Sequence, residues 1–159
     1  MDESISSLDK RIELMRQHMD GMTQVVPWAR ETGFKVTRVE RGQVWGVQPF
    51  AEHLVGDVDA QVIHGGAITT LLDNLSGMAC AASLEEFRFV ATLDLRIDYM
   101  KPATPGDDVL AFAECYKLTR RIAFVRGVAY HKKRDEPIAN ATATFMFTGA
   151  PDADTRGNL

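Results

Sequence analysis

Residues 64–84, HGGAITTLLDNLSGMACAASL, decide the expected fold. This stretch begins at the sharp break His64-Gly65-Gly66 and continues without proline as one long, mostly apolar helix. Apolar side chains recur at helical spacing and predict a buried stripe: Ile68, Leu71, Leu72, Leu75, Met78, Ala79 and Ala82. Asp73 lies off this stripe. Its face of the helix holds small and polar residues, namely Gly66, Thr69, Thr70 and Gly77.

The segments on both sides of this helix have the patterns of strands. We expect two strands before it, at 35–40 and 43–47, and four after it, at 89–99, 109–118, 122–131 and 138–147. Consecutive strands joined by short turns favour an antiparallel sheet, because parallel neighbours need long crossovers. The predicted fold class is α+β, with a long central helix against a curved antiparallel sheet of about five to six strands.

Strict alternation within 89–99 divides that strand into two faces. It places Ala91, Leu93, Leu95, Ile97 and Tyr99 on one face and Val90, Thr92, Asp94, Arg96 and Asp98 on the other. Thr92 and Tyr99 are therefore expected to point in opposite directions.

The remaining segments are assigned more simply. Residues 4–20 predict an amphipathic helix that ends at Gly21, with Ile5, Leu8, Ile12, Met15 and Met19 on its apolar face. An irregular link follows at Pro27 and Trp28, and the tail 149–159 is expected to fray. Residues 51–63 form an acidic loop that leads into the central helix. Its possible site residues are Glu52, His53, Asp57, Asp59 and Gln61.

The composition excludes several classes of protein. With 159 residues, 45% of them hydrophobic, the chain is expected to form a single domain over 1–159. The net charge of −4 and the lack of a basic stripe argue against nucleic acid as a partner. No segment has the pattern of a signal peptide or a membrane span, so we expect a cytoplasmic protein with no membrane partner. Cys80 and Cys115 predict neither a disulfide nor a metal site.

The helix start has two interpretations. The first turn of a helix carries unpaired N–H groups and a partial positive charge, which can hold an oxyanion or a thioester carbonyl. Glycines there also let a ligand approach the backbone closely. Alternatively, His64-Gly65-Gly66 is a plain helix entry in which His64 serves as a hydrogen-bonding cap.

Asp73 also has two interpretations. It lies about two and a half turns after His64 and can act as a general base on water or as a nucleophile on an acyl group. The alternative is a hydrogen-bonded carboxylate at a subunit interface. Thr92 can orient water or the carboxylate, and the basic turn of Arg120 and Arg121 can meet phosphates, although both patterns also occur without function.

Three segments together resemble a known family: 64–79 (HGGAITTLLDNLSGMA), 92–107 (TLDLRIDYMKPATPGD) and 120–124 (RRIAF). They are similar to the hotdog-fold acyl-CoA thioesterases of the PaaI-like (phenylacetate-pathway) type. The resemblance implies a central helix wrapped by a curved antiparallel sheet, and homodimers that pair into homotetramers with active sites between subunits. It also implies hydrolysis of acyl-CoA to a free acid and CoA, with no cofactor and no metal.

The resemblance assigns roles to particular residues. Gly65 would offer its backbone N–H to the thioester carbonyl, His64 would shape that site, and Asp73 would be the base or nucleophile. Thr92 would help to place water. The substrate-binding residues implied are Gly66, Gln61, Arg120 and Arg121.

One position departs from the family pattern. Many relatives have Asn or Gln shortly before the HGG motif, where this chain has Val58 six residues before His64. Either Gln61 or Asp59 takes over, or the polar group is absent.

Two other functions stay open from the sequence. One is a non-catalytic acyl-CoA-binding hotdog protein, consistent with Val58. The other is a 2-enoyl-CoA hydratase or dehydratase, since Asp59 and His64 have the Asp-x-x-x-x-His spacing of that chemistry. The acyl group is not determined by the sequence. Candidate pocket residues are Phe34, Trp45, Phe50, Leu54, Met78 and Phe87.

Overall fold

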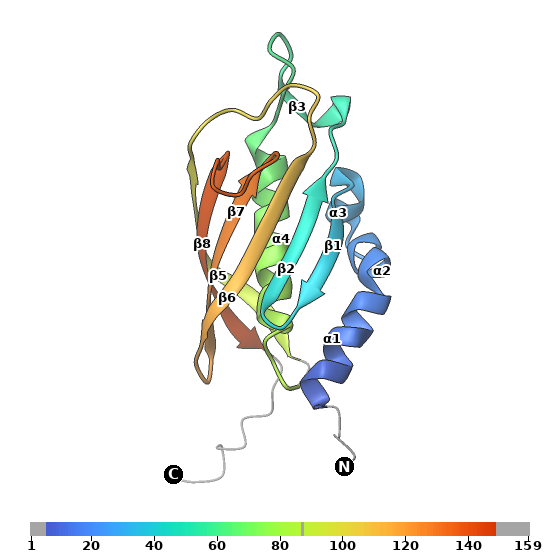
Figure 1. Ribbon diagram of the computed structural model, residues 1–159, viewed down its shortest axis with the longest axis vertical. Coiled ribbons are helices and arrows are strands. Elements are labelled where there is room, and N and C mark those ends of the chain that lie inside the picture. The colour runs from blue at the N-terminus through green and yellow to red at the C-terminus, as the bar shows by residue number, and fades with distance from the viewer. Residues whose placement is uncertain (1–5, 87, 149–159) are drawn as a thin grey trace.

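A single six-stranded antiparallel sheet curves around one long helix, α4 (Gly65–Ala81), in the computed structural model, which describes residues 6–86 and 88–148 (Figure 1). The strand order is β1-β2-β6-β7-β8-β5, so β1 and β5 are the two edges. The strands are β1 (Lys35–Glu40), β2 (Gln43–Gln48), β5 (Phe89–Tyr99), β6 (Val109–Leu118), β7 (Ile122–Tyr130) and β8 (Ala139–Thr148). The predicted α+β class is confirmed. No helix in the described ranges has the length and apolarity needed to cross a membrane.

The apolar stripe of α4 forms the centre of the core. Its predicted members are buried, except Met78, which is half-buried. Two glycines of the sheet allow the helix to lie close. A Cβ atom at Gly46 would lie 2.9 Å from Leu75 Cδ2, and one at Gly127 would lie 3.2 Å from Leu72 Cδ2. Larger side chains at these two positions would push α4 away from β2 and β7.

The N-terminal region differs from the single helix predicted over 4–20. It forms α1 (Ser7–Gln17), α2 (Met19–Gln24) and α3 (Pro27–Thr32), with the first break at His18. The prediction that Gly21 ends the helix is wrong, because Gly21 lies inside α2. The irregular link at Pro27 and Trp28 is wrong too, since proline is well suited to the first turn of a helix. Ile5, Phe87 and the tail 149–159 lie outside the described residues.

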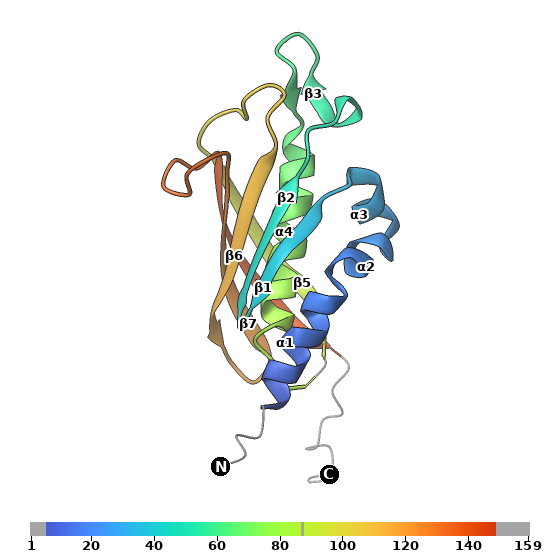
Figure 2. The same cartoon turned by 45° about the vertical axis from the view of Figure 1, so that its right-hand side comes forward.

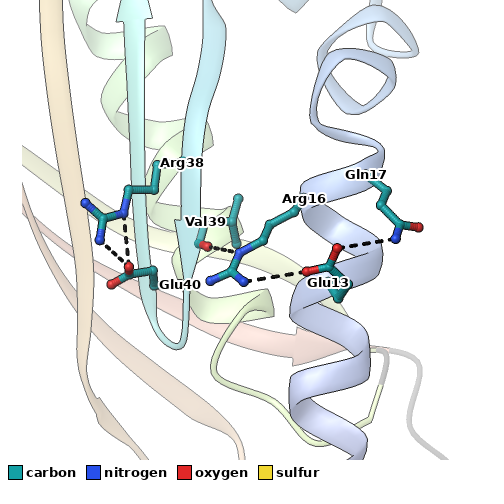
Figure 3. A network of polar contacts seen from close by, with 6 residues as sticks. All are labelled: Glu13, Arg16, Gln17, Arg38, Val39 and Glu40. Carbon is teal, nitrogen blue, oxygen red and sulfur yellow. Dashed lines mark hydrogen bonds and ion pairs between the residues drawn. The ribbon is translucent and has the colours of Figure 1, made fainter.

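Helix α1 packs along edge strand β1 (Figure 2). Its buried side chains are Leu8, Ile12 and Met15, as its periodicity predicts. Arg16 connects α1 to β1, because its Nε donates a 2.8 Å hydrogen bond to the Val39 carbonyl (Figure 3). Its Nη1 also forms an ion pair with Glu13 of the same helix at 3.6 Å. This helix therefore covers the outer edge of the sheet.

The loop predicted at 51–63 is partly regular. It contains a short 3-10 turn, η1 (Glu52–Leu54), and a hairpin of β3 (Val55–Asp57) and β4 (Val62–Ile63). This hairpin stands above the start of α4 (Figure 1). The last residue of η1 is joined to the start of α4 by a 2.7 Å hydrogen bond from the His64 N–H to the Leu54 carbonyl.

Strand β5 breaks the predicted alternation. Its register with β8 shifts between Thr92 and Asp94, which marks a β-bulge. Thr92 and Tyr99 both reach α4 through hydrogen bonds, to Asp73 and to Gly65. The prediction that they face opposite ways is therefore wrong. The extra residue in the bulge reverses the facing of every side chain beyond it.

Cys80 of α4 and Cys115 of β6 form a hydrogen-bonded pair of thiols at the far end of the helix. The bond from Cys80 is the largest cause that lowers the pKa of Cys115 from its ordinary value of 9.0 to about 7. The same bond, together with burial, raises the pKa of Cys80. Cys115 is thus the thiol that becomes a thiolate near neutral pH.

Cys115 should be alkylated in a pH-dependent manner. The thiolate is the reactive form and it accumulates as the pH rises through the pKa, so labelling by iodoacetamide should have a midpoint at about pH 7. In Cys80→Ala the main stabilising hydrogen bond is lost, and the midpoint should move upward. Peptide mass spectrometry reports the rates, and an unchanged midpoint in Cys80→Ala would contradict this assignment.

Candidate active site

The start of α4 is capped by His64. Its Nδ1 accepts the Gly66 N–H at 2.9 Å, and its carbonyl accepts the Ala67 N–H at 2.9 Å. Because Nδ1 is an acceptor here, the neutral ring carries its hydrogen on Nε2. A Cβ atom at Gly66 would lie 2.8 Å from Nδ1, so the glycine is needed for this cap. The capping interpretation of His64 is confirmed.

Gly65 is left with a backbone N–H that has no hydrogen-bond partner among residues 6–86 and 88–148. It is the first residue of the helix, where the partial positive charge favours an electron-rich ligand atom. Its carbonyl accepts a 2.6 Å hydrogen bond from the Tyr99 hydroxyl, which is also 3.0 Å from Thr69 Oγ1. A Cβ atom at Gly65 would lie 3.0 Å from that hydroxyl oxygen.

On the opposite side of the first turn of α4, Trp28 of α3 forms a hydrogen bond to Thr70. The Thr70 hydroxyl donates to the Gly66 carbonyl at 2.9 Å and accepts the Trp28 indole N–H at 3.0 Å. The first two carbonyls of α4 are therefore each bound by a side chain in addition to the helix's own hydrogen bonds.

A mostly apolar pocket of about 390 Å³ opens beside Gly65, between β4, the first turn of α4 and the end of β5. It is lined by Val62, Ile63, Gly65, Ile68, Tyr99, Met100, Lys101, Pro102, Ala103 and Ile138. An apolar group attached to a carbonyl at Gly65 has room in this pocket.

Asp73 is half-buried in the middle of α4 and faces edge strand β5. The Thr92 hydroxyl donates a 3.0 Å hydrogen bond to Asp73 Oδ1. No other hydrogen bond or ion pair of this carboxylate is found within the described ranges, so Oδ2 has no partner there. Thr92 thus fixes the orientation of a carboxylate whose other oxygen can accept a proton or attack a carbonyl.

Asp73 and Gly65 of one chain are too far apart to act on one carbonyl. They are separated by eight residues, which at 1.5 Å per residue is about 12 Å along the helix axis. An N–H that holds a carbonyl oxygen and a group that attacks its carbon each need to lie within about 3–3.5 Å of the atom they act on.

The polar side chains at the tip of the β3–β4 hairpin make no hydrogen bond or ion pair with His64, Gly65 or Asp73 within the described residues. Gln61 has a positive φ of 54° at the turn of the β3–β4 hairpin, and its amide Nε2 donates 2.8 Å to the Val58 carbonyl. Val58 itself is 74% exposed. No hydrogen bond or ion pair joins Asp59 to His64 among the described residues, so the Asp-x-x-x-x-His spacing does not form a pair here.

Arg120 and Arg121 lie in the turn between β6 and β7, at the far end of the sheet from the start of α4 (Figure 1). Their carbonyls accept hydrogen bonds from Arg88 and Phe147. One chain therefore does not bring them together with Gly65. In the described part of the chain, no group of three or more His, Cys, Asp or Glu side chains is placed to share a metal ion.

The comparisons with known proteins agree with this geometry. The model of the Thioesterase superfamily matches residues 60–138, which contain the HGG motif, Asp73, Thr92 and Tyr99. The chain belongs to the thioesterase superfamily. It is 28% identical over 134 residues to the medium/long-chain acyl-CoA thioesterase YigI of Escherichia coli K12, covering 76% of this chain and 85% of that protein. These relatives are acyl-CoA thioesterases, and this superfamily member is accordingly a thioester hydrolase.

Solved structures have the same fold. A Pseudomonas aeruginosa protein is 36% identical with a TM-score of 0.74, over 84% of this chain and 98% of its own. The PaaI protein of the E. coli phenylacetic acid degradation operon has a TM-score of 0.75, over 92% of this chain and 98% of its own. At 16% identity, PaaI supports the fold alone. The predicted hotdog fold and PaaI-like resemblance are confirmed.

Two residues that hold the first turn of α4, Tyr99 and Trp28, are not among the site residues predicted from the sequence. Tyr99 was placed on the wrong face of its strand because the bulge has no signal in the alternation. Trp28 stands in a helix that was predicted as an irregular link. For Tyr99, its position directly before the KPATPGD loop was the available signal.

His64→Ala should destabilise the protein by about 0.5–2 kcal/mol, because the Gly66 N–H loses its acceptor at the helix start. His64→Asn is the matched control, since Asn is a strong N-cap and should retain most of the stability. Urea denaturation at one fixed protein concentration measures both. An unchanged midpoint for His64→Ala would show that the cap contributes nothing.

Proposed function

We propose that this thioester hydrolase cleaves acyl-CoA, with Asp73 as the base or nucleophile and the Gly65 N–H as the donor to the thioester carbonyl. The observation that carries the proposal is the orientation of Asp73 by Thr92. It is supported by the unpaired Gly65 N–H at the positive end of α4 and by the thioesterase relatives. Gly66 would contribute to the substrate site indirectly, because its lack of a side chain leaves room for the His64 ring that caps the turn beside Gly65.

The chemistry follows from these groups. The Gly65 N–H and the helix dipole stabilise the negative charge that develops on the carbonyl oxygen during attack. Asp73 either removes a proton from the attacking water or attacks the carbonyl carbon itself. The C–S bond then breaks, and CoA leaves as the thiol after protonation. Where Asp73 activates water, the free acid forms in this same step. Where Asp73 is the nucleophile, a water molecule must then hydrolyse the acyl–Asp73 anhydride, which releases the free acid and restores the carboxylate. Both variants of the mechanism need the same placement of Asp73.

We propose that the site is shared between two subunits. Asp73 and Gly65 are equally far from Thr69, so a two-fold axis near Thr69 would place Asp73 of one chain beside Gly65 of the other. The helix face in question consists of small and polar residues, which allow two helices to approach closely. One subunit alone has both groups but cannot use them together.

Edge strand β5 supports the same dimer. No strand among residues 6–86 and 88–148 pairs with its outer edge, although β5 has eleven residues. It also exposes Phe89 and Leu93, at 65% and 52%. Long edge strands with exposed apolar side chains are usually covered, and a second β5 related by a two-fold axis would cover this one.

We further propose that two such dimers form a homotetramer through the outer face of the sheet. This face carries Trp45 packed against Phe112 in a tilted arrangement, with ring centroids 4.9 Å apart, and the ion pair of Arg126 with Glu114. Neighbouring charges of both signs suit an interface between identical copies. In such an assembly, Arg120 and Arg121 would bind CoA phosphates at a site completed by other subunits. Gln61 would contact substrate only after its side chain leaves the Val58 carbonyl.

Asp73→Asn should lower kcat by at least about 100-fold, because it removes the base or nucleophile but keeps the size and the Thr92 hydrogen bond. The assay is thiol release from acyl-CoAs of short, medium and long chain and from an aryl acyl-CoA. The control is Asp94→Asn, which replaces an exposed carboxylate on β5. This variant should retain parental turnover. A folded, oligomeric Asp73→Asn enzyme as fast as the parent would refute the proposal.

Native mass spectrometry should show dimers or tetramers of the 159-residue chain at micromolar concentration. The physical reason is that residues 6–86 and 88–148 of one chain leave the outer edge of β5 unpaired and Asp73 only half-buried. A purely monomeric protein that still turns over acyl-CoA would contradict the shared site, while leaving the thioesterase activity intact.

A further inference from the structure

Edge strand β5 contacts α4 at two polar points, and each point touches one of the two groups assigned to catalysis. Thr92 donates to Asp73 at 3.0 Å, and Tyr99 donates to the Gly65 carbonyl at 2.6 Å. Thr92 is explained by the proposed function. Tyr99 is a half-exposed aromatic residue, 49% accessible. Both hydrogen bonds found for its hydroxyl among the described residues are to the start of α4, at Gly65 and Thr69.

The contacts of Tyr99 are specific for a hydroxyl group. Its single proton is donated to the Gly65 carbonyl, so Thr69 Oγ1, 3.0 Å away, must donate its own proton to the Tyr99 oxygen. The ring also occupies the space where a side chain of residue 65 would stand, with Cζ 3.2 Å from an ideal Cβ. The phenol therefore takes the place of a side chain that Gly65 lacks. In this way a residue of β5 restrains the glycine at the first position of α4.

We infer that Tyr99 is a positioning residue of the thioesterase reaction, which holds the first turn of α4 so that the Gly65 N–H stays aimed at the thioester carbonyl. This inference rests on the proposed function. A helix start has few hydrogen bonds of its own, and glycine has the largest backbone freedom of any residue. Electrostatic stabilisation of a developing oxyanion requires a donor that does not have to reorganise. Tyr99 supplies that restraint.

The bulge in β5 is what permits this arrangement. Thr92 and Tyr99 are seven residues apart, an odd spacing that would place them on opposite faces of a regular strand. The register shift between Thr92 and Asp94 brings both onto the face toward α4. Within a shared site, Thr92 then orients Asp73 for one active site while Tyr99 of the same strand orients Gly65 for the other.

The first test is Tyr99→Phe, which removes only the hydroxyl. We expect kcat for the best acyl-CoA to fall about twofold to tenfold, the effect of losing one hydrogen bond, with little change in KM. Tyr116→Phe is the matched control, because Tyr116 is similarly exposed at 53% and lies on β6. In the Tyr99→Phe background, adding Thr69→Val should cause little further loss, since Thr69 acts through the same hydroxyl.

The second test uses mixed dimers of Tyr99→Phe and Asp73→Asn chains, purified through two different affinity tags. One active site then combines the intact Asp73 of the first chain with the intact Tyr99 and Gly65 of the second, and the other site carries both defects. We expect about half of the parental activity per dimer. A purely structural role of Tyr99, or a role beside its own Asp73, predicts only half of the Tyr99→Phe activity.

The outcomes separate this inference from the proposed function. If the parent releases no thiol from any acyl-CoA, the proposed function is refuted, and the inference falls with it. If the parent is active and Tyr99→Phe has the parental kcat, the positioning role alone is refuted. If Tyr99→Phe is impaired but the mixed dimer has only half of its activity, Tyr99 supports the fold and does not serve the opposite active site.

Discussion

The close approach of α4 to the sheet is the constraint on which the rest of the structure depends. Leu75 fills the space over Gly46, where a Cβ atom would collide with it, and Leu72 lies so close over Gly127 that a Cβ atom there would force it to shift. This contact fixes the depth of the helix in the curve of the sheet. It also fixes its rotation, because both leucines lie on the apolar stripe. With this rotation, the helix face that holds Thr69 and Asp73 points toward the line of contact between α4 and the edge strand β5.

This line of contact places Asp73 beside the edge of the sheet. Strand β5 is the last strand of the sheet. It therefore covers one side of the helix face that holds Thr69 and Asp73, and leaves the other side open. A carboxylate in this position is half-buried and oriented by Thr92, yet it remains reachable. The 12 Å that separate it from Gly65 follow from the same helix geometry. In the proposed mechanism, the helix that builds the core also divides the catalytic groups between two half-sites, which a second copy of the chain would combine.

The parts that could be predicted from the sequence are those governed by periodicity and by motif. The apolar stripe of α4, the six main strands and the His64 cap follow from spacing and residue type. What failed depends on single local irregularities. The bulge near Thr92 adds one residue without altering the apolar pattern, so the facing of Tyr99 could not be predicted. The break at His18 interrupts a helix whose apolar face continues beyond it.

The departure at Val58 gives these local details a further meaning. The family resemblance implies Asn or Gln at the position where this chain has the exposed Val58, and Gln61 donates its amide to the turn itself. In the proposed mechanism, the carbonyl site then depends on the Gly65 N–H and the helix dipole. With fewer donors to share the charge, the position of that one N–H has a larger effect on the barrier. The hydroxyl of Tyr99 on one side and the Trp28–Thr70 hydrogen bonds on the other hold this turn from two directions. A rigid helix start can thus compensate for the missing amide.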